Sequence, residues 1–126
     1  MISHINLGSN DLPRAEAFYN EFLKLYSGQL GFKNERTLFY LLGDGSGAKL
    51  AINLPFNGEP ATVGNGTMVA LAAANPEEVK AVYSKAMALG ASCDGEPGER
   101  MDGALYAAYF RDLDGNKFGV FCQMVS

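Results

Sequence analysis

The chain lacks several features that mark whole classes of protein. Its longest apolar runs, such as residues 68–74, fall far short of the roughly 20 residues that cross a bilayer. Its first residues carry neither the basic region nor the apolar stretch of a secretory signal. We therefore expect a cytoplasmic protein with no membrane partner.

Basic residues are also scarce. Ten Lys and Arg stand against 14 Asp and Glu, which gives a net charge of −4. A nucleic-acid-binding protein needs a basic surface that displaces counterions, and no basic cluster occurs here, so we expect no nucleic-acid partner. The two cysteines, Cys93 and Cys122, form no CxxC motif, and we interpret both as structural thiols.

What the chain does contain is enough apolar surface for one globular domain. Its 126 residues are 48% hydrophobic and 19% charged, which is typical of folded proteins and argues against disorder. A chain of this length buries roughly two thirds of its unfolded surface without disulfides or metals. We expect a single domain over residues 1–126.

An internal repeat organises this domain. Two amphipathic helices are predicted, each with a capping residue (Asp11 or Asn75) and a proline in the first turn, and we expect them to end at Gly31 and Gly90. Adding 64 to a position in the first helix gives its counterpart in the second. The matching apolar stripes are Ala15, Phe18, Tyr19, Phe22 and Leu23, and Val79, Val82, Tyr83, Ala86 and Met87. The same shift relates two preceding strands, at residues 4–8 and 67–72.

Further strand-like runs follow each helix. They are residues 33–36, 37–42 and 49–54 in the first half, and residues 105–111 and 117–123, with a weaker one after Gly90, in the second. Residues 57–66 are the expected linker, and residues 94–103 are expected to form a long loop. We predict an α+β fold of two βαβββ modules, at about residues 1–56 and 67–126. Their strands would form one strongly curved mixed sheet of about eight strands, with the helices on its outer face and a cleft on the other.

Three stretches carry a family resemblance: ISHINLGSNDLPRAEAFYN, GNGTMVALAAANPEEVKAVYSKAMALG and YAAYFRDLDGNKFGVFC. They resemble the vicinal oxygen chelate superfamily, which includes glyoxalase I, bleomycin-resistance proteins and extradiol dioxygenases. The resemblance implies that each half lends ligands to a divalent metal in the cleft, or that the cleft grips a small molecule without metal. It also implies a homodimer.

The resemblance places four metal-ligand positions, and His4 alone keeps a usual ligand. Met68 stands where a histidine is common, Gly119 where a glutamate is usual, and the fourth position falls at or next to Ala51. A thioether is a soft ligand, and Gly and Ala offer no donor for a hard divalent ion. We therefore expect no cofactor, and a divalent metal is the alternative.

His4 is the only histidine, and two interpretations of it remain. It is either a catalytic general base or substrate hydrogen-bond partner, or a polar wall residue left from the metal site. Aromatic side chains on strands, and a charged loop near residue 100, would line the cleft. The ligand-binding candidates are Tyr40, Met68, Arg100, Met101, Tyr106, Tyr109 and Gly119. Four residues of the terminal hairpin are interpreted as structural: Arg111, Asp112, Asp114 and Lys117.

Three functions fit this pattern. The first is a metal-free module that binds or sequesters a small aromatic or amphipathic molecule, as bleomycin-resistance relatives do. The second is an enzyme, a glyoxalase-like lyase or isomerase or a dioxygenase, with His4 and a metal completed by unrecognised ligands such as Glu99 or Asp102. The third is a regulatory or structural dimer that has lost chemistry. The sequence favours the first and leaves open whether any catalysis remains.

Overall fold

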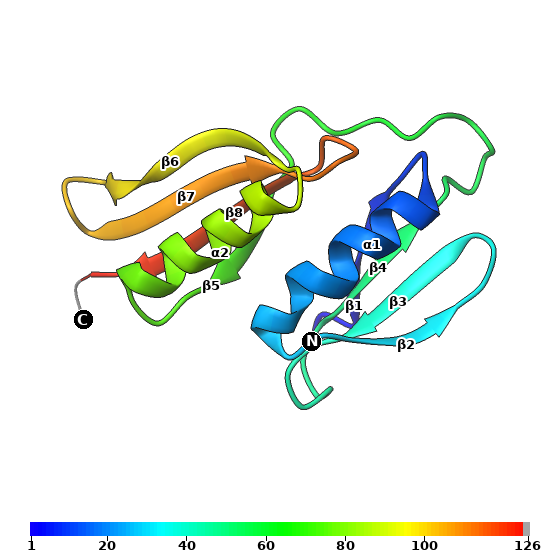
Figure 1. The fold of residues 1–126 in the computed structure, drawn as a ribbon, viewed down its shortest axis with the longest axis horizontal. Coiled ribbons are helices and arrows are strands. Elements are labelled where there is room, and N and C mark those ends of the chain that lie inside the picture. Colours follow the sequence, from blue (N-terminus) through cyan, green and yellow to red (C-terminus); the bar gives the residue numbers. More distant parts are fainter. Residues whose placement is uncertain (125–126) are drawn as a thin grey trace. The chain divides into compact units, whose positions relative to one another are not determined.

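The computed structural model describes residues 1–124 and divides the chain into two compact units. We call Met1–Thr62 the first module and Val63–Ser126 the second module. The boundary falls inside the predicted linker. Each module has the element order strand, helix, strand, strand, strand, as the sequence repeat predicts (Figure 1).

The first module is a four-stranded mixed sheet with one helix. Its elements are β1 (His4–Gly8), α1 (Leu12–Phe22), the 3-10 helix η1 (Leu23–Tyr26), β2 (Gln29–Lys33), β3 (Thr37–Leu41) and β4 (Lys49–Asn53). The strand order is β1-β4-β3-β2, in which β1 and β4 are parallel and the other pairs antiparallel.

The second module repeats this plan. Its elements are β5 (Val69–Ala72), α2 (Pro76–Ala88), β6 (Ser92–Arg100), β7 (Leu105–Arg111) and β8 (Lys117–Gln123). The order is β5-β8-β7-β6, again with one parallel pair, β5 and β8. The α+β class and the count of eight strands are confirmed, with four strands in each of two sheets. Neither helix is long and apolar enough to span a membrane within the described part of the chain.

The first helix ends earlier than the sequence predicts. Instead of continuing to Gly31, α1 passes into η1 and stops at Ser27, which has a left-handed backbone. The chain then turns tightly, with the Gly28 amide donating to the Leu23 carbonyl over 2.7 Å. A Cβ on Gly28 would lie 2.5 Å from the Leu23 Cβ, so Gly28 makes this close approach possible. Gly31 consequently lies inside β2.

The predicted loop at residues 94–103 is also wrong, because most of it is β6. This strand pairs with β7 through two register shifts, one between Cys93 and Gly95 and one between Gly95 and Gly98. Bulges and glycines break the alternation by which a strand is recognised in a sequence. Only the turn remains irregular, where Met101 and Asp102 both have a φ of 54°.

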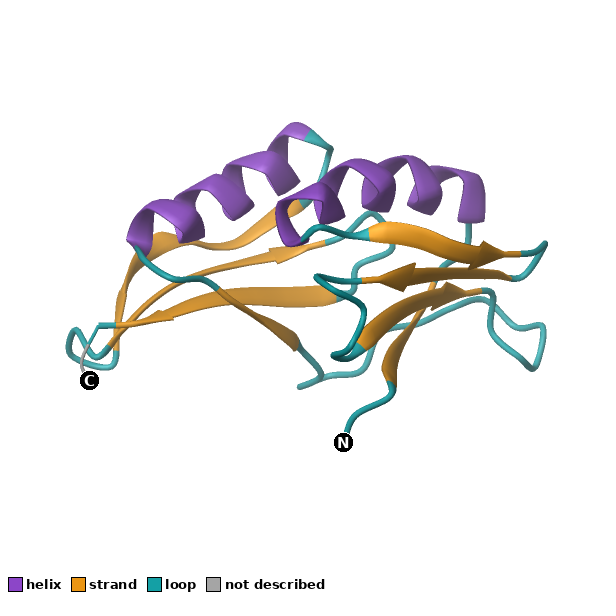
Figure 2. Ribbon diagram, turned by 90° about the horizontal axis from the view of Figure 1, so that it is seen from below, coloured by secondary structure: helices purple, strands orange, loops and turns teal. Residues whose placement is uncertain are grey.

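Each helix covers one face of its own sheet (Figure 2). In the first module, α1 buries its apolar stripe against alternate residues of β3 and β4: Leu38, Tyr40, Leu50 and Ile52. In the second module, Val79, Val82 and Ala86 of α2 are buried, as are Phe110, Phe118 and Val120 of the sheet. We call the opposite side of each sheet its far face.

Candidate functional site

Tyr109 is central to the far face of the second module. The Arg100 guanidinium carbon lies 5.6 Å from the centre of its ring, and the Lys117 Nζ lies 5.2 Å from it. Phe121 meets the same ring edge-on, with centroids 5.5 Å apart. Strand alternation explains the grouping, because Tyr109, Lys117 and Phe121 occupy alternate positions of paired strands.

A hollow of about 480 Å³ opens beside Tyr109. The strands contribute Tyr109, Arg111 and Lys117, and the segment leading into β5 contributes the rest of the lining: Asn65, Gly66, Thr67 and Met68. The hollow therefore combines an aromatic ring, a thioether, two cations and polar groups. Its volume falls in the range of small-molecule sites, roughly 300–1,000 Å³.

Gly119 lies next to this hollow and is tightly covered. A Cβ added there would lie 2.6 Å from the Phe121 Cε2 and 3.0 Å from the Met68 Sδ. The space that a side chain at position 119 would need is therefore filled by Phe121 and Met68. Their packing gives both residues a role on the far face that requires no metal.

The far face of the first module is more polar. The Thr37 hydroxyl donates to the Asn53 side-chain oxygen over 2.6 Å, and the Asn53 amide donates in turn to Asn6. These three residues also line a hollow of about 490 Å³ at the end of the strands. Arg36 joins this hollow and donates to the carbonyl of Pro55.

His4 lies at the start of β1 and is exposed. Its Nδ1 is 3.1 Å from the Ser3 hydroxyl, and its ring meets Phe39 edge-on with centroids 5.4 Å apart. Within residues 1–124, no carboxylate contacts the His4 ring to orient it. The side chain is thus accessible to solutes and held by an aromatic neighbour, which fits either interpretation of His4.

Two of the predicted tyrosines lie on the helix side of their sheets. Tyr40 is 1% exposed and donates through its hydroxyl to the Asn20 side-chain oxygen over 2.8 Å. Burial, with a smaller effect from Glu16, raises the pKa of Tyr40 well above its usual value. Tyr106 lies under Lys80 of α2, whose Nζ is 5.9 Å from the ring centroid. Neither tyrosine therefore lines a far face.

Three of the other predicted binding residues gather on the second-module far face around Tyr109. Met68 and Gly119 belong to the second-module far face, and Arg100 reaches it through its contact with Tyr109. Met101 is 73% exposed at the turn between β6 and β7. Both cysteines are free thiols: Cys122 is buried, as expected of a structural thiol, whereas Cys93 is exposed.

The positions that the resemblance assigns to metal ligands do not fit a hard divalent ion. His4 supplies an imidazole, but Ala51 is a buried methyl group, Gly119 has no side chain and Met68 offers a thioether. Mg²⁺, Mn²⁺ and Fe²⁺ favour oxygen and imidazole ligands. Among residues 1–124, no three His, Cys, Asp or Glu side chains form a group suited to a metal.

The sequence profile of the Glyoxalase/Bleomycin resistance protein/Dioxygenase superfamily matches residues 1–120. The chain belongs to this superfamily. A glyoxalase/bleomycin resistance protein from Albidiferax ferrireducens T118 shares 37% identity over 98% of both chains, with a TM-score of 0.84.

More distant members of the superfamily share the fold. A glyoxalase-related enzyme from Fulvimarina pelagi is 23% identical over 98% of this chain and 88% of its own, with a TM-score of 0.80. The fosfomycin resistance protein FosX from Listeria monocytogenes, in complex with Mn(II) and sulfate, is 20% identical over 99% and 91%, with a TM-score of 0.72. No curated protein matched the chain.

The lining of the hollow includes five residues that the sequence did not predict as binding residues: Asn65, Gly66, Thr67, Arg111 and Lys117. Arg111 and Lys117 were assigned to the terminal turn, although both also line the hollow. Asp94 was assigned to a loop, although its Oδ2 lies 3.3 Å from the Arg111 Nε and 3.2 Å from the Lys117 Nζ. Strand alternation would have placed Arg111 on the same face as Tyr109, whereas the bulges in β6 hid Asp94.

Proposed function

We propose that this member of the superfamily binds a small aromatic or amphipathic molecule without a metal ion, in the second-module hollow. The observation that carries the proposal is the hollow itself, with Tyr109 and Met68 in its wall. Aromatic and thioether groups supply apolar contact, and Thr67 and Asn65 supply hydrogen bonds that orient a ligand. Its function is then to bind or sequester the ligand.

The test is a thermal-shift screen of aromatic compounds on the full chain. A ligand that binds only the folded state raises the melting temperature with its concentration. We expect at least one compound to do so, and Tyr109→Leu to remove most of the shift. Phe32→Leu is the matched control, because Phe32 is an exposed aromatic on β2 in the other module. An unchanged melting temperature across a broad panel would contradict the proposal.

The alternative is a metal-dependent lyase, isomerase or dioxygenase that uses His4. Its test is the metal content of protein purified without chelator or metal-affinity resin, measured by mass spectrometry. The binding-module proposal expects no stoichiometric metal and no activity after addition of Mn²⁺, Ni²⁺ or Fe²⁺. About one metal per chain would favour the enzyme instead. The homodimer and the cytoplasmic location stay predictions.

A further inference from the structure

Positive charge is concentrated around the second-module hollow of a chain whose net charge is −4. Arg111 and Lys117 line the hollow, and Arg100 lies over the ring of Tyr109 beside it. These three cations share one face of the sheet. The fold requires only part of this local excess, since Lys117 has a counterpart in Lys49 of the first module, whereas the position equivalent to Arg111 holds Leu41.

The carboxylate of Asp94 partly neutralises this cluster. The Oδ2 atom of Asp94 serves both Arg111 and Lys117, at 3.3 and 3.2 Å. One carboxylate balances one of the two cations, so the pair keeps a net charge of about +1 before Arg100 is counted. All three side chains remain about one-third exposed, and a ligand can therefore reach them.

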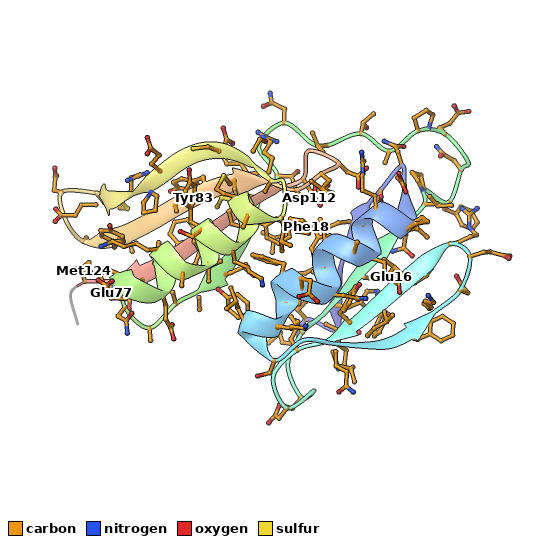
Figure 3. All side chains as sticks on the ribbon, viewed as in Figure 1. Glu16, Phe18, Glu77, Tyr83, Asp112 and Met124 are labelled. Atoms are coloured by element: carbon orange, nitrogen blue, oxygen red, sulfur yellow. The ribbon has the colours of Figure 1, made fainter. Side chains whose placement is uncertain are left out.

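The other acidic groups of β6 lie elsewhere. The negative charge of Glu96 affects the hydroxyl of Tyr83, a residue of α2 that is labelled in Figure 3. A hydrogen bond with Cys93, together with burial and the charges of Cys93 and Glu96, raises the pKa of Tyr83 to about 12. Glu99 is paired in register with Tyr106, which contacts Lys80 on the helix side. The contacts of both carboxylates are therefore on the helix side of the sheet, opposite the hollow.

We propose that the ligand of this hollow carries an oxyanion, a carboxylate or a phosphate ester, which Lys117 and Arg111 bind beside Tyr109. The inference rests on the proposed binding function and adds the chemical class of the ligand. The ring of the ligand contacts Tyr109 and Met68 while its oxyanion takes up the charge that Asp94 leaves unbalanced. Charge-assisted hydrogen bonds of this kind are about twice as strong as neutral ones.

The experiment compares three naphthalene compounds by isothermal titration calorimetry on the full chain: 1-naphthoate, 1-naphthyl phosphate and the neutral 1-naphthamide. We expect at least one anion to bind about tenfold more tightly than the amide, which corresponds to about 1.4 kcal/mol. The stronger of the two anions identifies which oxyanion the hollow prefers. The preference should weaken as salt is raised, since exposed charges are screened.

Two substitutions should change the affinity for the preferred anion in opposite directions. Lys117→Gln should weaken it about tenfold, because the protein loses a cation that binds the oxyanion. Asp94→Asn should strengthen it by about threefold or more, because the competing carboxylate is removed. Lys80→Gln is the matched control: Lys80 also lies over a tyrosine ring, but on the helix side, and its loss should leave the affinity unchanged.

The outcomes separate this inference from the function on which it rests. Binding of the amide as tightly as both anions would overturn the oxyanion and leave the binding function standing. Failure of all three compounds, and of the aromatic screen, would overturn both. Weaker anion binding by Asp94→Asn would also overturn the inference, and this variant decides the matter if Lys117→Gln does not fold.

Discussion

Gly119 shows how one residue type fixes the packing around it. Phe121 and Met68 approach its backbone so closely that a Cβ would touch both. The two side chains can do so only because position 119 carries none. The aromatic and thioether wall of the hollow therefore depends on a glycine at this position.

Gly119→Ala tests this dependence. The added methyl meets the Phe121 ring at 2.6 Å, and the ring must move, so we expect the free energy of unfolding to fall by about 1–2 kcal/mol. When Phe121→Ala is combined with Gly119→Ala, most of the destabilisation caused by Gly119→Ala should disappear. Chemical denaturation of the wild type, both single variants and the double variant gives the coupling energy. Additive effects would show that the two positions do not share this space.

At the scale of elements, two corresponding turns are held in different ways. Between β7 and β8, Asp112 is 5% exposed and its Oδ1 accepts the backbone N–H groups of Asp114 and Asn116 (Figure 3). The Oδ2 of Asp112 accepts a hydrogen bond from the side-chain amide of Asn116. Between β3 and β4, exposed Asp44 accepts hydrogen bonds from the Ser46 hydroxyl and N–H, and these bonds lower the pKa of Asp44. The turn between β7 and β8 is therefore more strongly constrained than the turn between β3 and β4.

Asp112→Ala should consequently destabilise the protein by about 2 kcal/mol, because it leaves buried donors without acceptors. Asp44→Ala should have little effect, since water replaces the lost contacts at an exposed turn. Thermal or urea unfolding of the two variants provides the measurement. Equal losses would mean that burial of the Asp112 network contributes nothing to stability.

The sequence predicted the regular elements better than the irregular ones. The ranges of β1, β7 and β8 were predicted as the structure has them, because each is a short strand-like run bounded by turn residues. The end of α1 was missed, since Gly28 acts through a contact with Leu23 that no periodicity reveals. Arg100 and Tyr109 were expected at the site, but the contact of Lys117 with the Tyr109 ring depends on the β7–β8 register.

At the scale of the whole molecule, a long irregular segment connects the two modules. It runs from the end of β4 to the start of β5. Residues 54–68 contain no helix or strand, and Phe56 within them is fully exposed. Proteases cleave most readily at exposed segments without backbone pairing.

Limited digestion with chymotrypsin should therefore cut first after Phe56 and release fragments 1–56 and 57–126. Phe32 is also exposed, but it lies in β2 and pairs with Phe39, so it should resist. Mass spectrometry at early times identifies the first products, and Phe56→Ala should slow their appearance. Earlier cleavage at Phe32 would show that β2 opens more readily than the connecting segment.

The crowding at Gly119 also makes the order of sequence changes matter. The superfamily resemblance places a glutamate at this position, and any side chain introduced there collides with Phe121. Introducing the acid in one step is therefore obstructed by the ring, whereas a smaller residue at position 121 makes room for it. While the Phe121 ring occupies this space, a glutamate at position 119 requires that position 121 be changed first. An engineer who wishes to rebuild a ligand at position 119 has to follow the same order.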